Sequence, residues 1–143
     1  MNERWQKYFI SVAELTAELS YCVRLKVGAV AVRDKRVICT GYNGTLPGMD
    51  NCCEIEIIDP VTKQPRLTTK DETEHAERNL IAHAARHGIA LLDSSLFITH
   101  APCMECAKAI VNAGFKNVYW RNIYRSPDGL ELLQRHKIAT FKV

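Results

Sequence analysis

Residues 75–77 read His-Ala-Glu and residues 102–106 read Pro-Cys-Met-Glu-Cys, and the fold expected for the chain is built around these two stretches. Each stretch is expected to open a helix. The imidazole of His75 and the thiolates of Cys103 and Cys106 suit a borderline-soft ion such as zinc. Three protein ligands leave the fourth tetrahedral position free for water or substrate, as in catalytic zinc sites. The two stretches therefore predict one catalytic zinc ion.

Helical and extended patterns alternate around these stretches. Residues 73–87 predict a helix that Thr73 caps and that Gly88 ends. Residues 95–100 predict a strand, and Pro102 fits the first position of a helix that stops at Gly114. The other helices are expected at 3–22 and 128–136, and the other strands at 27–32, 36–40, 116–121 and 137–142.

This order of elements predicts an α/β fold in a single domain, residues 1–143. A five-stranded mixed sheet should lie between helices in a three-layer α/β/α sandwich. The two metal-binding stretches then lie at the carboxyl end of the third strand, where open α/β sheets bind their ligands. Residues 41–48 are expected to form a loop. Residues 50–70 show no clear period and are expected to form a surface excursion that shapes the site or an oligomer contact.

Composition limits the class of protein. The chain has 143 residues, is 47% hydrophobic and has a formal net charge of +3. No apolar run reaches the roughly 20 residues that span a bilayer, and the N-terminus does not resemble a signal peptide, so we expect a cytoplasmic protein without membrane contact. The charge permits a phosphorylated substrate but is too small and too dispersed for a nucleic-acid groove. The C-x-x-C spacing favours reduced, metal-binding cysteines over disulfides.

Together the two stretches form the pattern H-x-E…P-C-x-x-C of zinc-dependent nucleobase deaminases. The chain resembles the cytidine/deoxycytidylate deaminase superfamily, and most closely its deoxycytidylate (dCMP) branch. The closer likeness rests on residues 26–30 (Lys-Val-Gly-Ala-Val), 41–44 (Gly-Tyr-Asn-Gly) and 107–114. The resemblance implies a cytidine-deaminase-like fold and the hydrolysis of dCMP to dUMP and ammonia, a reaction that supplies dUMP for dTMP synthesis.

Glu77 is the candidate proton shuttle. Zinc makes its bound water acidic enough to supply hydroxide at neutral pH for attack on C4 of cytosine. A carboxyl in a dry pocket beside the metal can carry a proton to N3 and later to the departing ammonia. Residues two apart on a helix point in different directions, so the resemblance, and not the spacing, places Glu77 beside the water.

The cysteine motif also allows other interpretations. Alone, Cys103 and Cys106 would equally suit a thioredoxin-like redox pair or half of a structural zinc ribbon. A ribbon needs a second C-x-x-C, and Cys52-Cys53 has the wrong spacing. Two alternatives stay open. One is a deaminase of another base, namely tRNA adenosine, guanine or free cytosine, and the other is a non-catalytic zinc-binding module on the same fold.

Cys22, Cys52 and Cys53 have two interpretations. In some dCMP deaminases, cysteines at similar places bind a second, structural zinc ion together with histidines from an insertion. That insertion is absent here, since residues 55–74 contain no histidine. The alternative is that these cysteines are free, buried thiols.

The resemblance also implies substrate contacts. Asn43 matches the asparagine with which related deaminases contact the nucleoside, and the alternative is a turn asparagine in a left-handed conformation. The backbone of Ala76 and the carbonyl of Ala101 would read the Watson–Crick edge of cytosine. Tyr124 could stack on or flank the substrate, or it could be a surface aromatic.

A 5′-phosphate needs cations or helix-end amides. Arg24 and Lys26 come just before the first predicted strand and are the candidates; the alternative is that both are solvated surface charges. Residues 43–48 match, with the proline one place late, the family loop that helps to bind the activator dCTP and the inhibitor dTTP. The resemblance further implies a homo-oligomer, from dimer to hexamer.

Overall fold

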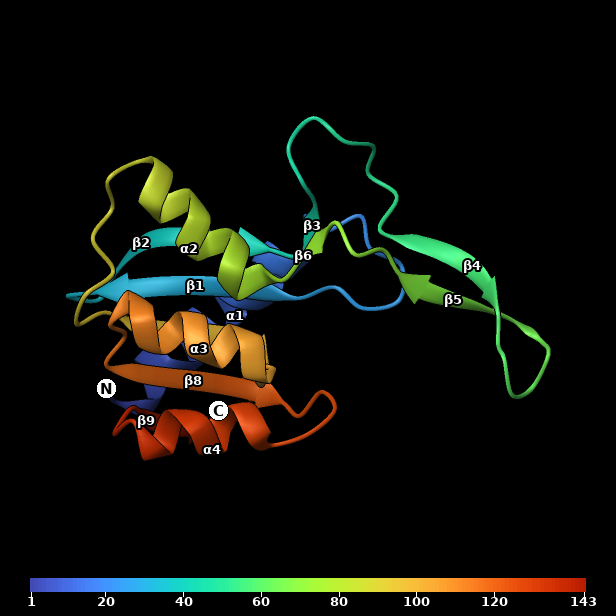
Figure 1. The fold of residues 1–143 in the computed structure, drawn as a ribbon. Coiled ribbons are helices and arrows are strands. Elements are labelled where there is room, and N and C mark those ends of the chain that lie inside the picture. The colour runs from blue at the N-terminus through green and yellow to red at the C-terminus, as the bar shows by residue number, and fades with distance from the viewer.

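The core of the computed structural model, which describes residues 1–143, is a five-stranded sheet with the strand order β2-β1-β7-β8-β9 (Figure 1). Its strands are β1 (Gly28–Arg33), β2 (Arg36–Tyr42), β7 (Ser95–His100), β8 (Asn117–Asn122) and β9 (Ala139–Lys142). β1 runs antiparallel to β2 and to β7, whereas β7, β8 and β9 are parallel. The mixed sheet predicted from the sequence is confirmed.

Helices cover both faces of this sheet. They are α1 (Glu3–Ala17), α2 (Ala76–Arg86), α3 (Met104–Ala113) and α4 (Asp128–Arg135). α1 alone covers one face, where Phe9 and Ile10 pack against Val30 and Phe97, and the other three helices lie on the opposite face (Figure 1). This arrangement confirms the three-layer α/β/α sandwich. None of the helices combines the length and the apolar character needed to cross a bilayer.

β7 is buried on both of its faces. Phe97 packs on the α1 side, while Leu96 and Ile98 belong to the cluster under α2 and α3, and all of them are fully buried. A strand with both faces shielded from water has a nearly continuous run of apolar residues. Its carboxyl end leads directly into residues 101–106, so a strand buried on both faces supports the predicted metal site.

An arm extends from the sandwich where the sequence predicted a surface excursion without assigned strands. It is a hairpin of β4 (Glu54–Ile58) and β5 (Pro65–Thr69), and it projects away from the sheet (Figure 1). Beside its base, β3 (Gly44–Thr45) pairs with β6 (Thr73–Glu74) inside stretches expected to be loop and helix. The hairpin was not predicted because most of its residues are exposed and because Pro65, which cannot donate to a ladder, occupies the first position of a strand.

Three helix boundaries differ from the predictions. α1 ends at Ala17, and not near residue 22, because the following residues leave the helix to contact the loop after β2, where the Ser20 hydroxyl donates to the Asn43 carbonyl at 2.7 Å. Thr73 does not cap α2, since it belongs to β6. Pro102 is not the first residue of α3, which begins at Met104 with Cys103 as its N-cap.

Gly41, on β2, allows α2 to approach the sheet closely. A Cβ at this position would lie 2.5 Å from the carbonyl oxygen of Ala76 and 2.7 Å from the backbone nitrogen of Leu80. Both are backbone atoms of α2, so a side chain could be accommodated only by moving the whole helix. The absence of a side chain at Gly41 therefore sets the position of the helix that begins next to His75.

We expect Gly41→Ala to lower the free energy of unfolding by about 1–3 kcal/mol, because the added methyl group overpacks the sheet against α2. Chemical denaturation measures this change. Gly44→Ala is the matched control, since a Cβ there has no neighbour within 4 Å. Equal stability of the two variants would contradict the role given to Gly41.

Candidate active site

The three predicted zinc ligands come together at two helix N-termini. His75 is the N-cap of α2 and Cys103 is the N-cap of α3, and both have an extended backbone. Cys106 is the third residue of α3, so its side chain faces back toward the cap of its own helix. The Nδ1 atom of His75 lies 3.6 Å from the Cys103 sulfur and 3.3 Å from the Cys106 sulfur.

These distances fit a tetrahedral zinc ion. Bond lengths of about 2.0 Å to nitrogen and about 2.3 Å to sulfur separate two tetrahedral ligand atoms by about 3.6 Å. The three ligand atoms all lie within 4.8 Å of one another. One imidazole and two thiols are also the donor set that zinc prefers over harder ions such as magnesium. The residues present therefore fit the metal.

The two cysteines of the site differ in protonation, and Cys103 is the one that favours ligation. A hydrogen bond with the Cys106 thiol lowers the pKa of Cys103 to about 3, and His75 contributes in the same direction. The pKa of Cys106 is raised, first by that same hydrogen bond and then by burial. One of the two sulfurs is thus a thiolate even without metal. The positive ends of the α2 and α3 dipoles, which meet here, also stabilise negative charge on the ligands.

Glu77 is the second residue of α2 and is 4% exposed. The sequence could not place it beside His75, because residues two apart on a helix diverge. The structure removes this difficulty: His75 is the cap and lies outside the helical spiral, so its ring can turn toward the cavity that Glu77 also lines. Burial raises the pKa of the Glu77 carboxyl above its ordinary value. A raised pKa suits a group that must both take up and release a proton.

A cavity of about 340 Å³ opens beside the predicted ligands. This volume lies in the usual range for small-molecule sites, about 300–1,000 Å³. The lining side chains come from the sandwich, from the segment before β1 and from the arm. They are Cys22, Arg24, Leu25, Val27, Asn43, Glu54, Thr69, Thr73, His75, Ala76, Glu77, His100, Ala101, Cys103, Ile123 and Tyr124.

Asn43 lines this cavity, but its amide is already engaged. Its Oδ1 accepts from the backbone N–H of Val27 at 2.7 Å, and its Nδ2 donates to the carbonyl of Leu25 at 2.8 Å. Asn43 therefore fixes the segment before β1. Its φ is not positive, so the alternative of a turn asparagine in a left-handed conformation is wrong.

The other predicted substrate contacts divide into two groups. Ala76, Ala101, Tyr124 and Arg24 all line the cavity. Lys26 is absent from the lining, and its ammonium group pairs with Glu18 at 3.3 Å. The structure therefore brings Arg24, and not Lys26, to the candidate site.

The expectation that residues 50–70 shape the site or an oligomer contact named none of the side chains through which the arm lines this cavity. Glu54 and Thr69, which are paired residues of β4 and β5, form part of the wall together with Thr73. Glu54 follows Cys52-Cys53, and nothing in this local pattern distinguishes it from an ordinary surface glutamate. Its burial depends on contacts with residues about thirty positions earlier in the chain, which no local signal reports.

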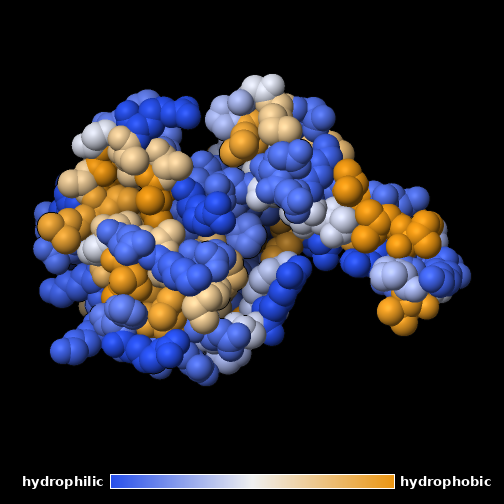
Figure 2. Space-filling model, viewed as in Figure 1, coloured by the Kyte–Doolittle hydropathy of each residue, from blue (hydrophilic) through white to orange (hydrophobic).

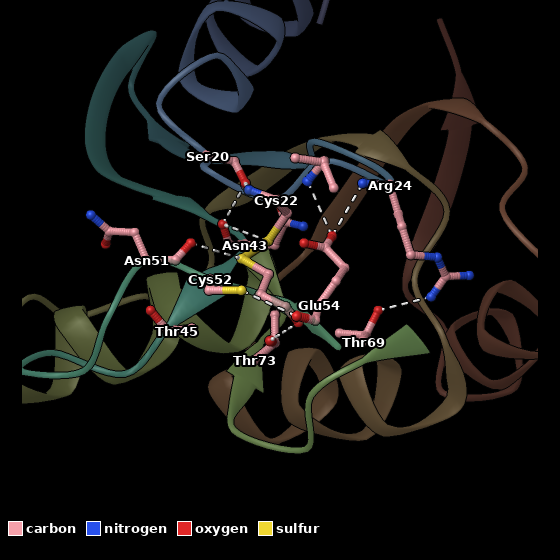
Figure 3. Close-up of a disulfide and its surroundings, with 12 residues drawn as sticks. Ser20, Cys22, Arg24, Asn43, Thr45, Asn51, Cys52, Glu54, Thr69 and Thr73 are labelled. Carbon is pink, nitrogen blue, oxygen red and sulfur yellow. Dashed lines mark hydrogen bonds between the residues drawn. A yellow bond between two sulfur atoms is a disulfide. The ribbon is translucent and has the colours of Figure 1, made fainter. Parts of the chain in front are cut away.

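Cys22 and Cys53 form a disulfide that joins the segment before β1 to the base of the arm (Figure 3). Their Cα atoms are 5.2 Å apart. The expectation of reduced cysteines is wrong for this pair, and neither interpretation of Cys22 and Cys53, as ligands of a second zinc ion or as free thiols, agrees with a bond between their sulfurs. Cys52 is a free thiol, as one of the two interpretations has it, but it is exposed and not buried.

Comparison with known proteins agrees with this geometry. ComE operon protein 2 of Bacillus subtilis is 35% identical over 97% of this chain and 71% of its own length. The deoxycytidylate deaminase of Mycobacterium phage D29 is 34% identical over 81% of this chain and 93% of its own. The crystal structure of a dCMP deaminase from cyanophage S-TIM5, in complex with dCMP and dUMP, superposes with a TM-score of 0.89 at 36% identity and covers 100% of this chain and 99% of that one.

A family model assigns the chain more broadly. The model of the cytidine and deoxycytidylate deaminase zinc-binding region matches residues 3–122, which include every predicted zinc ligand and Glu77. With this match, the candidate metal site and the similarity to dCMP deaminases point to the same enzymes. The chain belongs to the cytidine and deoxycytidylate deaminase family of zinc-dependent hydrolases.

Proposed function

We propose that the chain hydrolyses dCMP to dUMP and ammonia. The observation that carries the proposal is the buried Glu77 carboxyl, which lines one nucleotide-sized cavity together with His75 and Cys103. Proteins named deoxycytidylate deaminase are among the relatives, and the S-TIM5 enzyme was crystallised with dCMP and dUMP. One catalytic zinc ion, held by His75, Cys103 and Cys106, is part of the proposal.

The backbone around the proposed zinc ligands can hold the base. Ala76 is the first residue of α2, so its N–H has no partner within the helix and can donate to O2 of cytosine. The Ala101 carbonyl lies beside the cavity and can accept from the exocyclic amino group. Together these two groups would turn C4 toward the metal site.

Glu77 moves the protons of the reaction. Zinc, when bound, makes water acidic enough to serve as the nucleophile at neutral pH. The carboxylate of Glu77 takes a proton from this water and gives it to N3 as the oxygen bonds to C4. Glu77, again a carboxylate, then takes the remaining proton from the new C4 hydroxyl and delivers it to the amino nitrogen. The C4–N bond breaks, ammonia leaves and C4 becomes the carbonyl of uracil.

Arg24 is the proposed contact for the 5′-phosphate. Arg24 lines the cavity, and its guanidinium has one neutral hydrogen-bond partner, the Thr69 hydroxyl at 3.0 Å, which also lines the cavity. No acidic side chain pairs with it, so its charge is available to an anion. Tyr124, whose ring lies 6.5 Å from that of His100, forms another part of the wall and can flank the nucleotide.

The alternatives are less well supported. A non-catalytic zinc module would not need a buried carboxyl with a raised pKa beside its metal ligands, yet Glu77 is such a group. A deaminase of free cytosine or guanine would have no use for a cation such as Arg24 in the cavity wall. The formal net charge of +3 also gives little support to recognition of an RNA substrate.

We also propose that the chain forms a homo-oligomer and responds to dCTP and dTTP. Apolar side chains are exposed along the arm, at Ile55, Ile58, Val61 and Leu67, and Figure 2 shows apolar surface there. A second cavity, of about 430 Å³, is lined by the loop after β2 and by the cation Arg86, and an effector nucleotide would fit it. Light scattering with and without dCTP measures the oligomer. The cytoplasmic location expected from the sequence stays a prediction.

We expect Glu77→Ala to lose about 10²–10⁴-fold in kcat for dCMP, because general acid–base catalysis contributes that much, while its zinc content stays near one ion per chain. The ultraviolet change from cytosine to uracil gives the rate, and elemental analysis gives the metal. Glu105→Ala is the control, since the exposed Glu105 pairs with Lys108 on the surface. An active Glu77→Ala variant would rule out the proton shuttle.

We expect Arg24→Ala to raise KM for dCMP about 10- to 100-fold, because a charge-assisted hydrogen bond contributes about 1.5–3 kcal/mol. KM for deoxycytidine, which lacks the phosphate, should stay within about twofold in the same variant. Steady-state kinetics on both substrates make the comparison, with Lys26→Ala as the control. If Lys26→Ala raised KM for dCMP and Arg24→Ala did not, the assignment of the phosphate contact to Arg24 would be wrong.

A further inference from the structure

Glu54 is a buried acid whose surroundings leave half of its carboxylate unused. It is 8% exposed and begins β4, at the base of the arm. Its Oε1 accepts from the backbone N–H groups of Val23 and Arg24, each at 3.1 Å (Figure 3). These two bonds fix the orientation of the carboxylate against the segment that precedes β1.

No cation neutralises Glu54. The guanidinium of Arg24 turns to Thr69, and Glu54 takes part in none of the ion pairs of the molecule. Burying a carboxylate without a cation is unfavourable unless hydrogen bonds compensate. Two N–H groups compensate one oxygen only, so the second oxygen, Oε2, still requires a donor.

Oε2 is free to bind a ligand. No hydrogen bond within the chain uses it, and it is not among the fully enclosed side-chain polar atoms that lack a partner. Glu54 lines the same cavity as His75 and Glu77. A carboxylate oxygen is an acceptor only, so Oε2 offers an acceptor to any ligand in this cavity.

The chemistry of dCMP leaves one group for this acceptor. The phosphate is an anion, which Glu54 repels, and the amino group of the base is placed at Ala101. The remaining donor of a 2′-deoxynucleotide is its 3′-hydroxyl. The backbone contact between Glu54 and Arg24 also places the acceptor next to the proposed phosphate contact, as the 3′ and 5′ positions of one sugar require.

We propose that Oε2 of Glu54 accepts a hydrogen bond from the sugar 3′-hydroxyl, and that Glu54 is therefore a specificity-determining residue for the sugar. The assignment rests on the proposed function, because dCMP defines which donors the ligand carries. It gives the arm a part in substrate recognition: the hairpin carries the acceptor, and the Cys22–Cys53 disulfide holds the base of the hairpin beside the cavity.

Glu54→Gln separates this contact from the structural role of Glu54. Only the carbonyl oxygen of glutamine can accept from the two backbone N–H groups, so its NH₂ group takes the place of Oε2 and removes the charged acceptor from the cavity. The segment at residues 23–24 keeps both of its bonds. Glu56→Gln is the matched control, since Glu56 is an exposed glutamate on the same strand.

The experiment compares two ligands in the wild-type chain and in both variants. Kd is measured by calorimetry for dUMP and for 2′,3′-dideoxyUMP, and kcat/KM for dCMP and 2′,3′-dideoxyCMP. In the wild-type chain and in Glu56→Gln, loss of the hydroxyl should weaken binding and turnover about 10- to 100-fold, as for a hydrogen bond to a charged group. In Glu54→Gln, removal of the hydroxyl should weaken binding and turnover by less than about fivefold, because only a neutral hydrogen bond can remain.

If removing the 3′-hydroxyl weakened binding equally in Glu54→Gln and in the wild-type chain, the assignment would be overturned. It would also be overturned if removing the hydroxyl had no effect in the wild-type chain, and that result does not depend on whether the variant folds. Binding of dUMP requires no turnover. A chain that binds dUMP with the predicted dependence on Glu54 but does not deaminate dCMP would overturn the proposed function and leave the sugar contact in place.

Discussion

The proposed active site depends on the meeting of two helix N-caps at the carboxyl end of β7. A cap residue has an extended backbone, so His75 and Cys103 project their side chains outside the spirals of the helices they begin. This geometry lets Cys106 face its own cap and lets Glu77 share a cavity with His75. Both helices must therefore be placed accurately, and their supports differ. α3 follows directly from the fully buried β7, whereas α2 depends on the close contact at Gly41 and on the pairing of β3 with β6.

The parts of this arrangement that are encoded locally could be predicted from the sequence. Each of the five core strands has β-forming residues between turn residues, and the proposed zinc ligands are residue types at fixed spacing, so both are visible in one sequence. The start of α2 could not be predicted in this way. Thr73 is a residue type that often caps helices, but here it pairs in a strand with Thr45, nearly thirty residues away. The arm was missed for a related reason: its strands bury so little that they show no alternation of apolar and polar residues.

The contacts in the cavity wall could not be predicted from local sequence. Arg24 and Lys26 are two residues apart and have similar side chains, and nothing local separates their roles. Distant partners do so: Glu18 pairs with Lys26, while Glu54 binds the backbone at Arg24. The disulfide between Cys22 and Cys53 joins residues separated by 31 positions, and the spacing of the cysteines gives no sign of it. Predicting these contacts requires the fold itself.

The two ends of the cavity carry different charged groups. At one end, two helix N-termini and the zinc ligands favour an electron-rich reaction centre. At the other end, Arg24 and Glu54 lie near each other without pairing, because two backbone N–H groups bind one oxygen of Glu54 and a hydroxyl binds the guanidinium of Arg24. An ion pair between them would have cancelled both charges. Kept apart, one can attract an anion while the other accepts a hydroxyl, so the same few contacts that hold the arm in place also leave two opposite charges available to one ligand.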